Sequence, residues 1–334
     1  MSTTLQSLWR GSTNYGLHET TAMVSAINRT FTVCLPDVDR TIGRLQELHL
    51  SIQENSRNQF NVLSCEGMTF SFIHRSDLGD YVLLKQRFLA ELLGHTSRKV
   101  LIMIRDPLDW MVSAHAQHVR EGGCVALRDY AQLYRSVMLN NLNLQATADF
   151  WKAAGCEIVI LPIELYRQNR TAFWSAYETR LGVDAPDSRE VDLGPIGANT
   201  TNYDTLDLHQ TLNAALTAMQ EIVANNAVPR QADCLQAIKF VRQWGTRRAL
   251  TFSDSDQNRR LRQILNQPEQ ADPAPLTFDR AFVDYLQTYF LAVIDESESM
   301  FPQSIRQQYE QTLRAMVLQP GVDGSNASLL QAND

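Results

Sequence analysis

The chain has few of the features that mark secreted, membrane or metal-binding proteins. No apolar run approaches the ~20 residues needed to cross a bilayer. The opening stretch, MSTTLQSLWRGSTN, lacks the charged start and apolar core of a signal peptide. The 5 cysteines are scattered, without a CxxC pair or a zinc-ligand spacing, which favours a reducing compartment. We therefore expect a cytoplasmic protein without a metal site and without a membrane partner.

Positive charge is also scarce. The 334 residues contain 30 Lys and Arg against 37 Asp and Glu, which gives a formal net charge of -7. This balance argues against a general nucleic-acid or membrane-surface binder, although it leaves room for a local basic pocket. The G-x-x-x-x-G-K-[ST] pattern of nucleoside-triphosphate P-loops is missing. The length fits one large α/β domain, or one domain with a helical extension.

The most informative segment is a buried strand that leads directly into a helix. Val100 to Ile104 is short, apolar and partly β-branched, as expected for a strand buried on both faces. Asp106 is a good N-cap, and Pro107 suits the first helical position. Arg105 then leaves the carboxyl end of a strand, and Ser113 lies two turns into the helix. This edge of an open α/β sheet is where ligands bind, and an Arg near a hydroxyl is well suited to a phosphate.

A second anion site is predicted near the start of the chain. Thr4 to Trp9 is interpreted as a short strand, and a helical pattern runs from Leu17 to Ile27. The loop between them is polar and could surround an anion with backbone N–H groups and hydroxyls, although an ordinary strand-to-helix turn fits equally well. The candidate binding residues of this loop are Arg10, Gly11, Ser12, Thr13 and Asn14.

Two residues are candidate general bases. Phe60 to Ser64 is predicted as the second strand, and Glu66 follows its end beside a glycine. A solvated turn residue is the commoner explanation for a single Glu. His74 is the other candidate, and its structural alternative is a partly buried histidine bonded to the backbone.

The rest of the chain predicts an α/β fold, with a central parallel sheet flanked by helices and a helical C-terminal third. We expect a core over residues 1–204, a helical part of the same domain over 205–318, and a flexible tail over 319–334. A long polar loop is predicted over 183–203. Further helices are predicted over 38–54, 78–94, 127–153 (one or two helices), 170–181, 205–225, 230–250, 255–266, 277–299 and 302–318, and a further strand over 156–161.

Together these strand-end features resemble the P-loop-like sulfotransferases that use 3′-phosphoadenosine 5′-phosphosulfate (PAPS). The family motif R-[DN]-P-x-D-x-x-x-S is complete here, and the segment that follows is similar to the bacterial branch. The resemblance covers about residues 1 to 205. It implies that the Arg and the Ser of the motif hold the 3′-phosphate of PAPS. The motif residues in this chain are Arg105, Asp106, Pro107, Asp109 and Ser113.

The resemblance also implies roles for the other candidates. The loop from Arg10 to Asn14 would hold the 5′-phosphosulfate, and Arg10 would stabilise the leaving oxygen where the family usually has Lys. Glu66 would be the general base, with His74 in reserve. A second alignment places the family loop G-L-H-K-T-G-T-T on residues 16–21, with Glu19 where the family has Lys. The first alignment is preferred because an apolar segment precedes its loop.

The predicted activity is in-line transfer of a sulfuryl group from PAPS to a hydroxyl or amine, releasing adenosine 3′,5′-bisphosphate without a metal. Acidic net charge disfavours a long polyanion as the acceptor, so a small molecule or a sugar is expected. Two alternatives stay open. One is a degenerate, non-catalytic nucleotide-binding protein, and the other is a P-loop small-molecule kinase that uses ATP and magnesium. The sequence does not indicate an oligomeric state.

Overall fold

The computed structural model describes residues 2–19, 24, 25, 27, 60–64, 73–94, 99–190, 206–227, 229–241, 263, 276–296 and 301–317. Most of these residues are helical, and two pairs of parallel strands lie among them. The predicted α/β class is therefore confirmed. The predicted helix over 38–54, the tail from Gln319 and almost all of the predicted helix over 255–266 lie outside the described residues.

Both strand pairs are parallel. β1 (Tyr15–Glu19) pairs with β2 (Phe60–Ser64), with Tyr15 opposite Phe60. β3 (Lys99–Ile104) pairs with β4 (Glu157–Pro162), with Lys99 opposite Glu157. Within the described residues no strand hydrogen bonds join one pair to the other.

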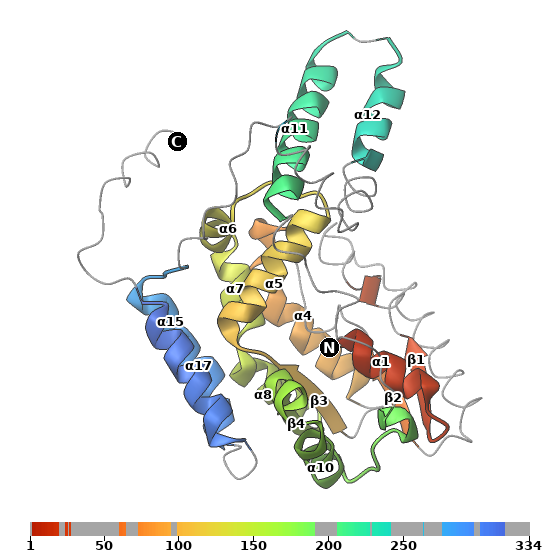
Figure 1. Ribbon diagram of the computed structural model, residues 1–334, viewed down its shortest axis with the longest axis vertical. Helices are drawn as coiled ribbons and strands as arrows, with labels where there is room; N and C mark the ends of the chain where they lie inside the picture. Colours follow the sequence, from red (N-terminus) through yellow and green to blue (C-terminus); the bar gives the residue numbers. More distant parts are fainter. Residues whose placement is uncertain are drawn as a thin grey trace.

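The helices and helical turns make up most of the described chain (Figure 1). They are α1 (Ser2–Gly11), η2 (Ser76–Leu78), α4 (Tyr81–Leu93), α5 (Pro107–Arg120), α6 (Leu127–Leu133), α7 (Arg135–Asn141), α8 (Leu144–Ala153), α9 (Ile163–Gln168), α10 (Arg170–Leu181), η3 (Asp187–Glu190), α11 (Leu206–Asn225), α12 (Gln231–Phe240), α15 (Arg280–Leu286), η6 (Gln287–Leu291), α16 (Ala292–Glu296) and α17 (Gln303–Ala315).

The prediction of a strand from Thr4 to Trp9 is wrong, because this segment belongs to helix α1. Leu5 and Leu8 are each 1% exposed, and Trp9 is 6% exposed. Their spacing of three and four residues forms one helical stripe, which packs into the core. The segment is so short, with only these three apolar residues, that their spacing alone could not distinguish a helix from a strand.

The prediction of a helix from Leu17 is also wrong at its start, because Tyr15 to Glu19 forms strand β1. The Tyr15 and Phe60 rings lie 5.3 Å apart across the strand pair. Phe60 also donates its N–H to the Asn14 carbonyl at 3.1 Å, just before the strand begins. Pairing with β2 therefore decides the conformation here, since a strand partner far along the chain outweighs a weak local helical pattern.

Other local predictions are confirmed. The predicted strands at 60–64, 100–104 and 156–161 correspond to β2, β3 and β4, and the helix over 170–181 to α10. Gly182 ends α10 in the left-handed conformation, with φ of 62°. The segment over 127–153 instead forms three helices, and Asn143 caps the third by accepting the Ala146 N–H at 2.9 Å.

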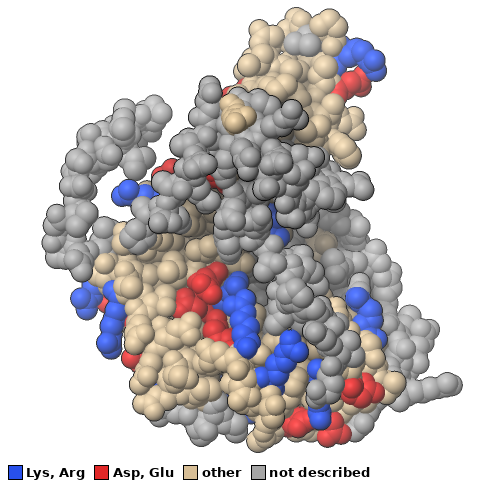
Figure 2. All heavy atoms as spheres, in the orientation of Figure 1, with Lys and Arg blue, Asp and Glu red and all other residues tan. Residues whose placement is uncertain are grey.

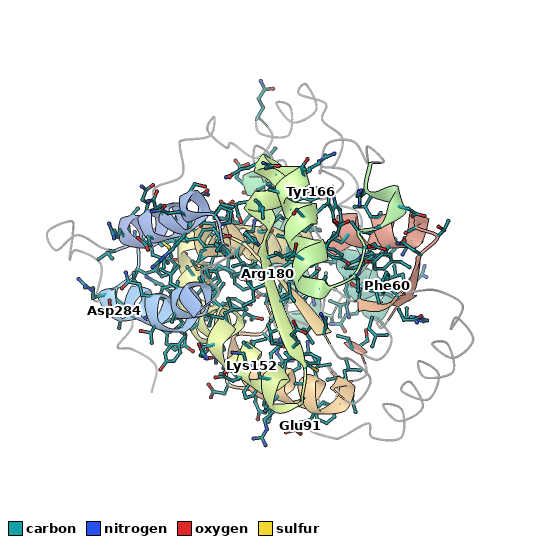
Figure 3. The ribbon with its side chains drawn as sticks, turned by 90° about the horizontal axis from the view of Figure 1, so that it is seen from below. Phe60, Glu91, Lys152, Tyr166, Arg180 and Asp284 are labelled. Carbon is teal, nitrogen blue, oxygen red and sulfur yellow. The ribbon has the colours of Figure 1, made fainter. Side chains whose placement is uncertain are left out.

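The C-terminal third is helical, as predicted, where it is described. α11 and α12 form a hairpin that projects from the rest of the chain, while α15 and α17 lie side by side (Figure 1). Seen from below, β3 and β4 lie between the C-terminal helices, marked by Asp284, and the N-terminal part, marked by Phe60 (Figure 3). One large cluster of buried residues joins these parts, from Leu5 in α1 to Leu313 in α17.

Charged side chains of both signs lie beside one another in the lower half of the face in Figure 2. The projecting hairpin is mostly uncharged on this face, apart from a basic and an acidic patch. Arg230 and Asp233 form an exposed ion pair there at 2.8 Å.

Candidate functional site

The carboxyl end of β3 is joined to α5 by a short, well-capped connection. Asp106 accepts the backbone N–H groups of Leu108, at 3.0 Å, and of Asp109, at 3.4 Å. Pro107 occupies the first helical position, where no N–H is needed. The Asp-Pro pair therefore determines where α5 begins. Arg105 lies between the end of β3 and this cap.

Arg105 carries a charged group without a hydrogen-bond partner in the described part of the chain. Its side chain is 25% exposed, and its nearest carboxylate oxygen is Asp109 Oδ2, 3.9 Å from Nε. That separation is too long for a hydrogen bond. The Nε atom is also buried without a partner among the described residues. Because buried donors are nearly always paired, this guanidinium is a candidate ligand-binding group.

Ser113 lies on the same side of α5. Asp109 and Ser113 are four residues apart on this helix, so their side chains are neighbours, with about 5–6 Å between Cβ atoms. Arg105 reaches toward Asp109 and therefore toward the stripe that includes Ser113. The Ser113 side chain is partly exposed. Asp109 thus lies between Arg105, just before α5, and Ser113, one turn further along the helix.

This pair fits a phosphate or sulfate group. A guanidinium offers several N–H donors in a rigid fork, and a hydroxyl adds one more. Asp109 is 54% exposed, so its charge is screened by water and orients the guanidinium without satisfying it.

The loop from Arg10 to Asn14 does not lie where it was predicted. It connects α1 to the amino end of β1, so it is not at the carboxyl end of a strand. Its groups bind a carboxylate of the chain itself: Ser12 Oγ donates to Asp187 Oδ1 at 2.5 Å, and the Thr13 N–H lies 3.1 Å from the same oxygen. The Thr13 hydroxyl donates to Asp187 Oδ2.

These bonds lower the pKa of Asp187, with the Ser12 hydroxyl as the main cause and Thr13 next. The hydrogen-bonding groups of Ser12 and Thr13 are therefore taken up by a carboxylate of the chain itself. Arg10 is exposed at the end of α1.

The carboxyl ends of β1 and β2 lie at Glu19 and Ser64. Because the strands are parallel and in register, these two strand ends lie at the same edge. Glu66 follows β2 by two residues, and Thr20 and Thr21 follow β1 directly. These three residues lie outside the described part of the chain, so the structure places only the strand ends that precede them.

The structure does not bring His74 to Arg105. His74 Nε2 lies 2.7 Å from Glu121 Oε2, and its Nδ1 lies 3.3 Å from His118 Nδ1. His118 and Glu121 lie at the C-terminal end of α5, which is about 20 Å long at ~1.5 Å per residue. Arg105 precedes the other end of this helix.

His74 belongs instead to a cluster of rings. The His118 ring lies 5.0 Å from the Tyr130 ring and 5.3 Å from the Tyr134 ring. Burial, with His74 and His115 nearby, lowers the pKa of His118 to about 4. Burial also lowers the pKa of His115, whose Nε2 lies 2.9 Å from the Val125 carbonyl oxygen. The alternative of a histidine with a structural role therefore fits His74 better than a base beside Arg105.

Sequence reasoning missed a buried polar network behind Arg105. Glu164 in α9 accepts the Asp106 N–H at 3.1 Å and the Tyr309 hydroxyl at 2.5 Å. Its position just after strand β4 was a usable signal, because the same reasoning singled out Glu66 after β2. No local pattern marks Tyr309, which is 145 residues away from Glu164.

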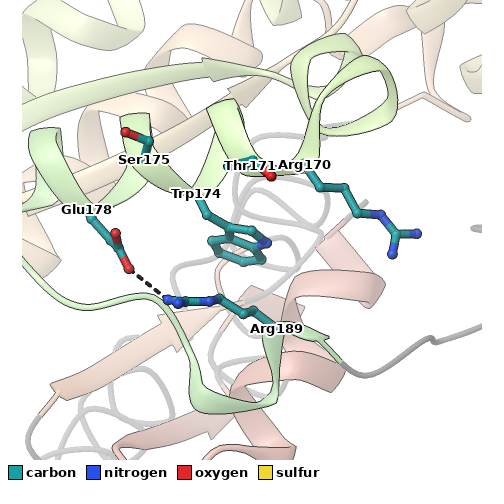
Figure 4. A pocket seen from close by; sticks show the side chains of 6 residues that line it. All are labelled: Arg170, Thr171, Trp174, Ser175, Glu178 and Arg189. Carbon is teal, nitrogen blue, oxygen red and sulfur yellow. Dashed lines mark hydrogen bonds and ion pairs between the residues drawn. The ribbon is translucent and has the colours of Figure 1, made fainter.

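A separate hollow of about 220 Å³ lies on α10 and η3, beside Trp174 (Figure 4). Arg189 crosses it and pairs with Glu178 at 2.8 Å. Arg170 lies at its other side, with its guanidinium 5.3 Å from the Tyr166 ring centre. The hollow is lined by α10 and η3, whereas Arg105 and Ser113 belong to the β3–α5 connection.

In comparisons with known proteins, the chain matches no protein-family model, no curated protein and no solved structure. Among the residues that the structure describes, no helix combines the length and the apolar character needed to span a membrane.

Proposed function

We propose that this protein binds PAPS at the carboxyl end of β3 and transfers its sulfuryl group to a small hydroxyl- or amine-bearing acceptor. The observation that carries the proposal is the Arg105 guanidinium, which has no hydrogen-bond partner in the described chain and reaches toward the helix stripe of Ser113. The complete R-D-P-x-D-x-x-x-S motif supports the assignment of this pair to a 3′-phosphate.

The position of the pair supports a phosphate ligand rather than a purely structural role. Ligands of open α/β sheets bind outside the carboxyl ends of the strands. A 3′-phosphate there would accept N–H groups from Arg105 and the hydroxyl proton of Ser113. We take β1–β2 and β3–β4 to be parts of one central parallel sheet, which would place all four strand ends at one edge.

The 5′-phosphosulfate is assigned to the segment after β1. This assignment follows the second alignment, on residues 16–21, because β1 ends at Glu19 whereas the Arg10–Asn14 loop precedes the strand and binds Asp187. Glu66, which follows the paired strand β2, is the proposed base that takes the proton of the acceptor. Transfer in line then depends on holding the acceptor oxygen or nitrogen behind the sulfur atom.

A second candidate function is nucleotide binding without turnover. The specific observation in its favour is Glu19, which ends β1 where the family loop carries a Lys. A carboxylate at this position repels a phosphosulfate and cannot stabilise the leaving oxygen. The binding proposal is independent of this choice, since Arg105 and Ser113 lie on other elements.

Titration calorimetry tests the binding proposal. We expect adenosine 3′,5′-bisphosphate to bind more tightly than adenosine 5′-monophosphate or ATP with magnesium. Arg105→Ala should weaken the bisphosphate about 100-fold, because a charged, two-donor contact to phosphate is lost. Arg170→Ala, an exposed arginine on α10, is the matched control. Tighter binding of ATP than of the bisphosphate would instead favour a kinase.

A transfer assay separates the two candidate functions. Sulfate-labelled PAPS is incubated with the protein and panels of phenols, amines and neutral sugars, and labelled products are separated from PAPS. Labelled product that disappears in Glu66→Gln supports the sulfotransferase. Tight bisphosphate binding without product from any panel would support the non-catalytic protein.

A further inference from the structure

The connection between β3 and α5 holds two buried carboxylates. Asp106 is 4% exposed and Glu164 is 5% exposed. Burying a carboxylate is costly unless its oxygens accept hydrogen bonds. Here all four oxygens do so, because Asp106 Oδ1 caps α5 and the other three bind the groups described next.

Two side chains of α17 complete this network. Thr312 donates its hydroxyl to Asp106 Oδ2 at 2.6 Å, and Tyr309 donates its hydroxyl to Glu164 Oε2 at 2.5 Å. Glu164 Oε1 accepts the Asp106 N–H at 3.1 Å. Burial, together with the charge of Glu164, raises the pKa of Tyr309 above its usual range, so this hydroxyl stays protonated and can donate.

The network acts on the backbone from which Arg105 projects. The Asp106 N–H belongs to the peptide group that follows Arg105, so its bond to Glu164 restricts the orientation of that peptide. The bond from Thr312 holds the Asp106 side chain in its capping position. A contact to phosphate depends on the placement of the guanidinium to within a fraction of an ångström.

We propose that Tyr309 and Thr312 are positioning residues, which act through Glu164 and Asp106 to aim Arg105 at the 3′-phosphate. This role rests on the proposed function, since it concerns the same phosphate. The C-terminal helix α17 thereby contributes to nucleotide selectivity although its two residues bind only protein groups in the network.

Nucleotide selectivity tests the proposal in the full-length chain. The readout is the ratio of dissociation constants for adenosine 5′-monophosphate and adenosine 3′,5′-bisphosphate, which isolates the 3′-phosphate because the two nucleotides share every other group. We expect Tyr309→Phe and Thr312→Val each to lower this ratio about tenfold, as a small misplacement of a binding group does. Binding of the monophosphate should change by less than about twofold, because its groups lie elsewhere.

Three further variants test whether the change in the ratio could come from a general disturbance of the fold. Thr312→Ser keeps the hydroxyl and should restore the ratio. Thr288→Val and Tyr289→Phe make the same chemical changes on the exposed side of η6 and should leave it unchanged.

The outcomes separate this role from the proposed function. A wild-type protein that binds the two nucleotides equally would refute the 3′-phosphate site and this role with it. A selective wild type whose selectivity survives both α17 variants, or whose variants weaken both nucleotides equally, would refute the positioning role alone.

Discussion

At the scale of single residues, a substitution of Ser113 is the most direct test of the proposed nucleotide site. In the described part of the chain its hydroxyl has no partner, so removing it should not disturb the fold. A hydrogen bond to a charged group contributes about 1.5–3 kcal/mol. We therefore expect Ser113→Ala to weaken adenosine 3′,5′-bisphosphate at least about tenfold while the melting temperature stays within about 1 °C.

Calorimetry and thermal unfolding measure these two effects separately. Ser175→Ala, at an exposed serine on α10, is the control for both. A fall in melting temperature that accounts for the weaker binding would show that Ser113 supports the helix and not the ligand.

His118 makes the stability of the fold depend on pH. Its pKa falls from 6.5 to about 4 in the folded chain, mainly through burial, so the folded state excludes a proton that the unfolded state accepts. The free energy of unfolding should be highest above pH 6.5 and fall as the pH drops to about 4, by about 3 kcal/mol. His115 contributes in the same direction.

Urea unfolding between pH 7 and pH 4 measures this dependence. His118→Gln removes the titrating group, so the stability of this variant should fall less steeply than that of the wild type. Equal slopes would mean that His118 is protonated in the folded chain, in contact with Glu121 or His74.

At the scale of elements, one side chain docks the projecting hairpin onto α5. Asn213 of α11 is fully buried and donates to the carbonyl oxygens of Val119, at 2.7 Å, and Gly123, at 2.8 Å. Asn213→Ala would leave both carbonyl oxygens without these donors, at about 1–3 kcal/mol each. We expect faster hydrogen exchange in α11 and α12, with β3 and β4 unchanged.

Met219→Ala is the matched control, because Met219 lies on the same helix and is 51% exposed. Exchange that accelerates equally throughout the chain in Asn213→Ala would show that the hairpin and the core unfold as one unit.

Some elements could be predicted from the sequence because their signals are local. The apolar run before Arg105 and the Asp-Pro cap after it identify β3 and α5, and Gly182 marks the end of α10. The start of the chain could not be predicted in this way. Three apolar residues, Leu5, Leu8 and Trp9, are too few in so short a segment for their spacing to distinguish a helix from a strand. Pairing with β2 decides the conformation of β1.

The same distinction between local signals and long-range contacts applies to the candidate site. The spacing of Arg105 and Ser113 follows from one continuous segment. The bond between Tyr309 and Glu164 spans 145 residues, and the bond between Ser12 and Asp187 spans 175. Contacts of this kind depend on packing of the whole chain, which a single sequence does not reveal.

At the scale of the whole molecule, the core contains hydroxyls that must stay protonated. Burial is the main cause of raised pKa values for Tyr15, Tyr130, Tyr177 and Tyr309, which lie in β1, α6, α10 and α17. In the unfolded chain these groups ionise near pH 10.0. Stability should therefore be fully present below pH 10.0 and fall as the pH rises above it, because the unfolded state loses protons first.

Tyrosinate absorbance and circular dichroism, followed together through an alkaline titration, check this expectation. The four buried tyrosines should ionise in the same step in which helical signal is lost, whereas the protein in urea should show one simple titration. Full ionisation with the helical signal intact would contradict the burial of these rings.

The contacts that join α1 and the loop after it to α10 and η3 also affect how the chain folds during synthesis. Ser12 and Thr13 bind Asp187, Ser188 donates to the Leu8 carbonyl at 2.5 Å, and Trp9 donates to the Tyr177 hydroxyl at 3.3 Å. A ribosome adds about 5–20 residues per second, so roughly ten seconds or more separate the synthesis of α1 from that of its partners. During that interval Leu8 and Trp9 lack these contacts, so α1 can complete its folded contacts only after α10 and η3 have been synthesised.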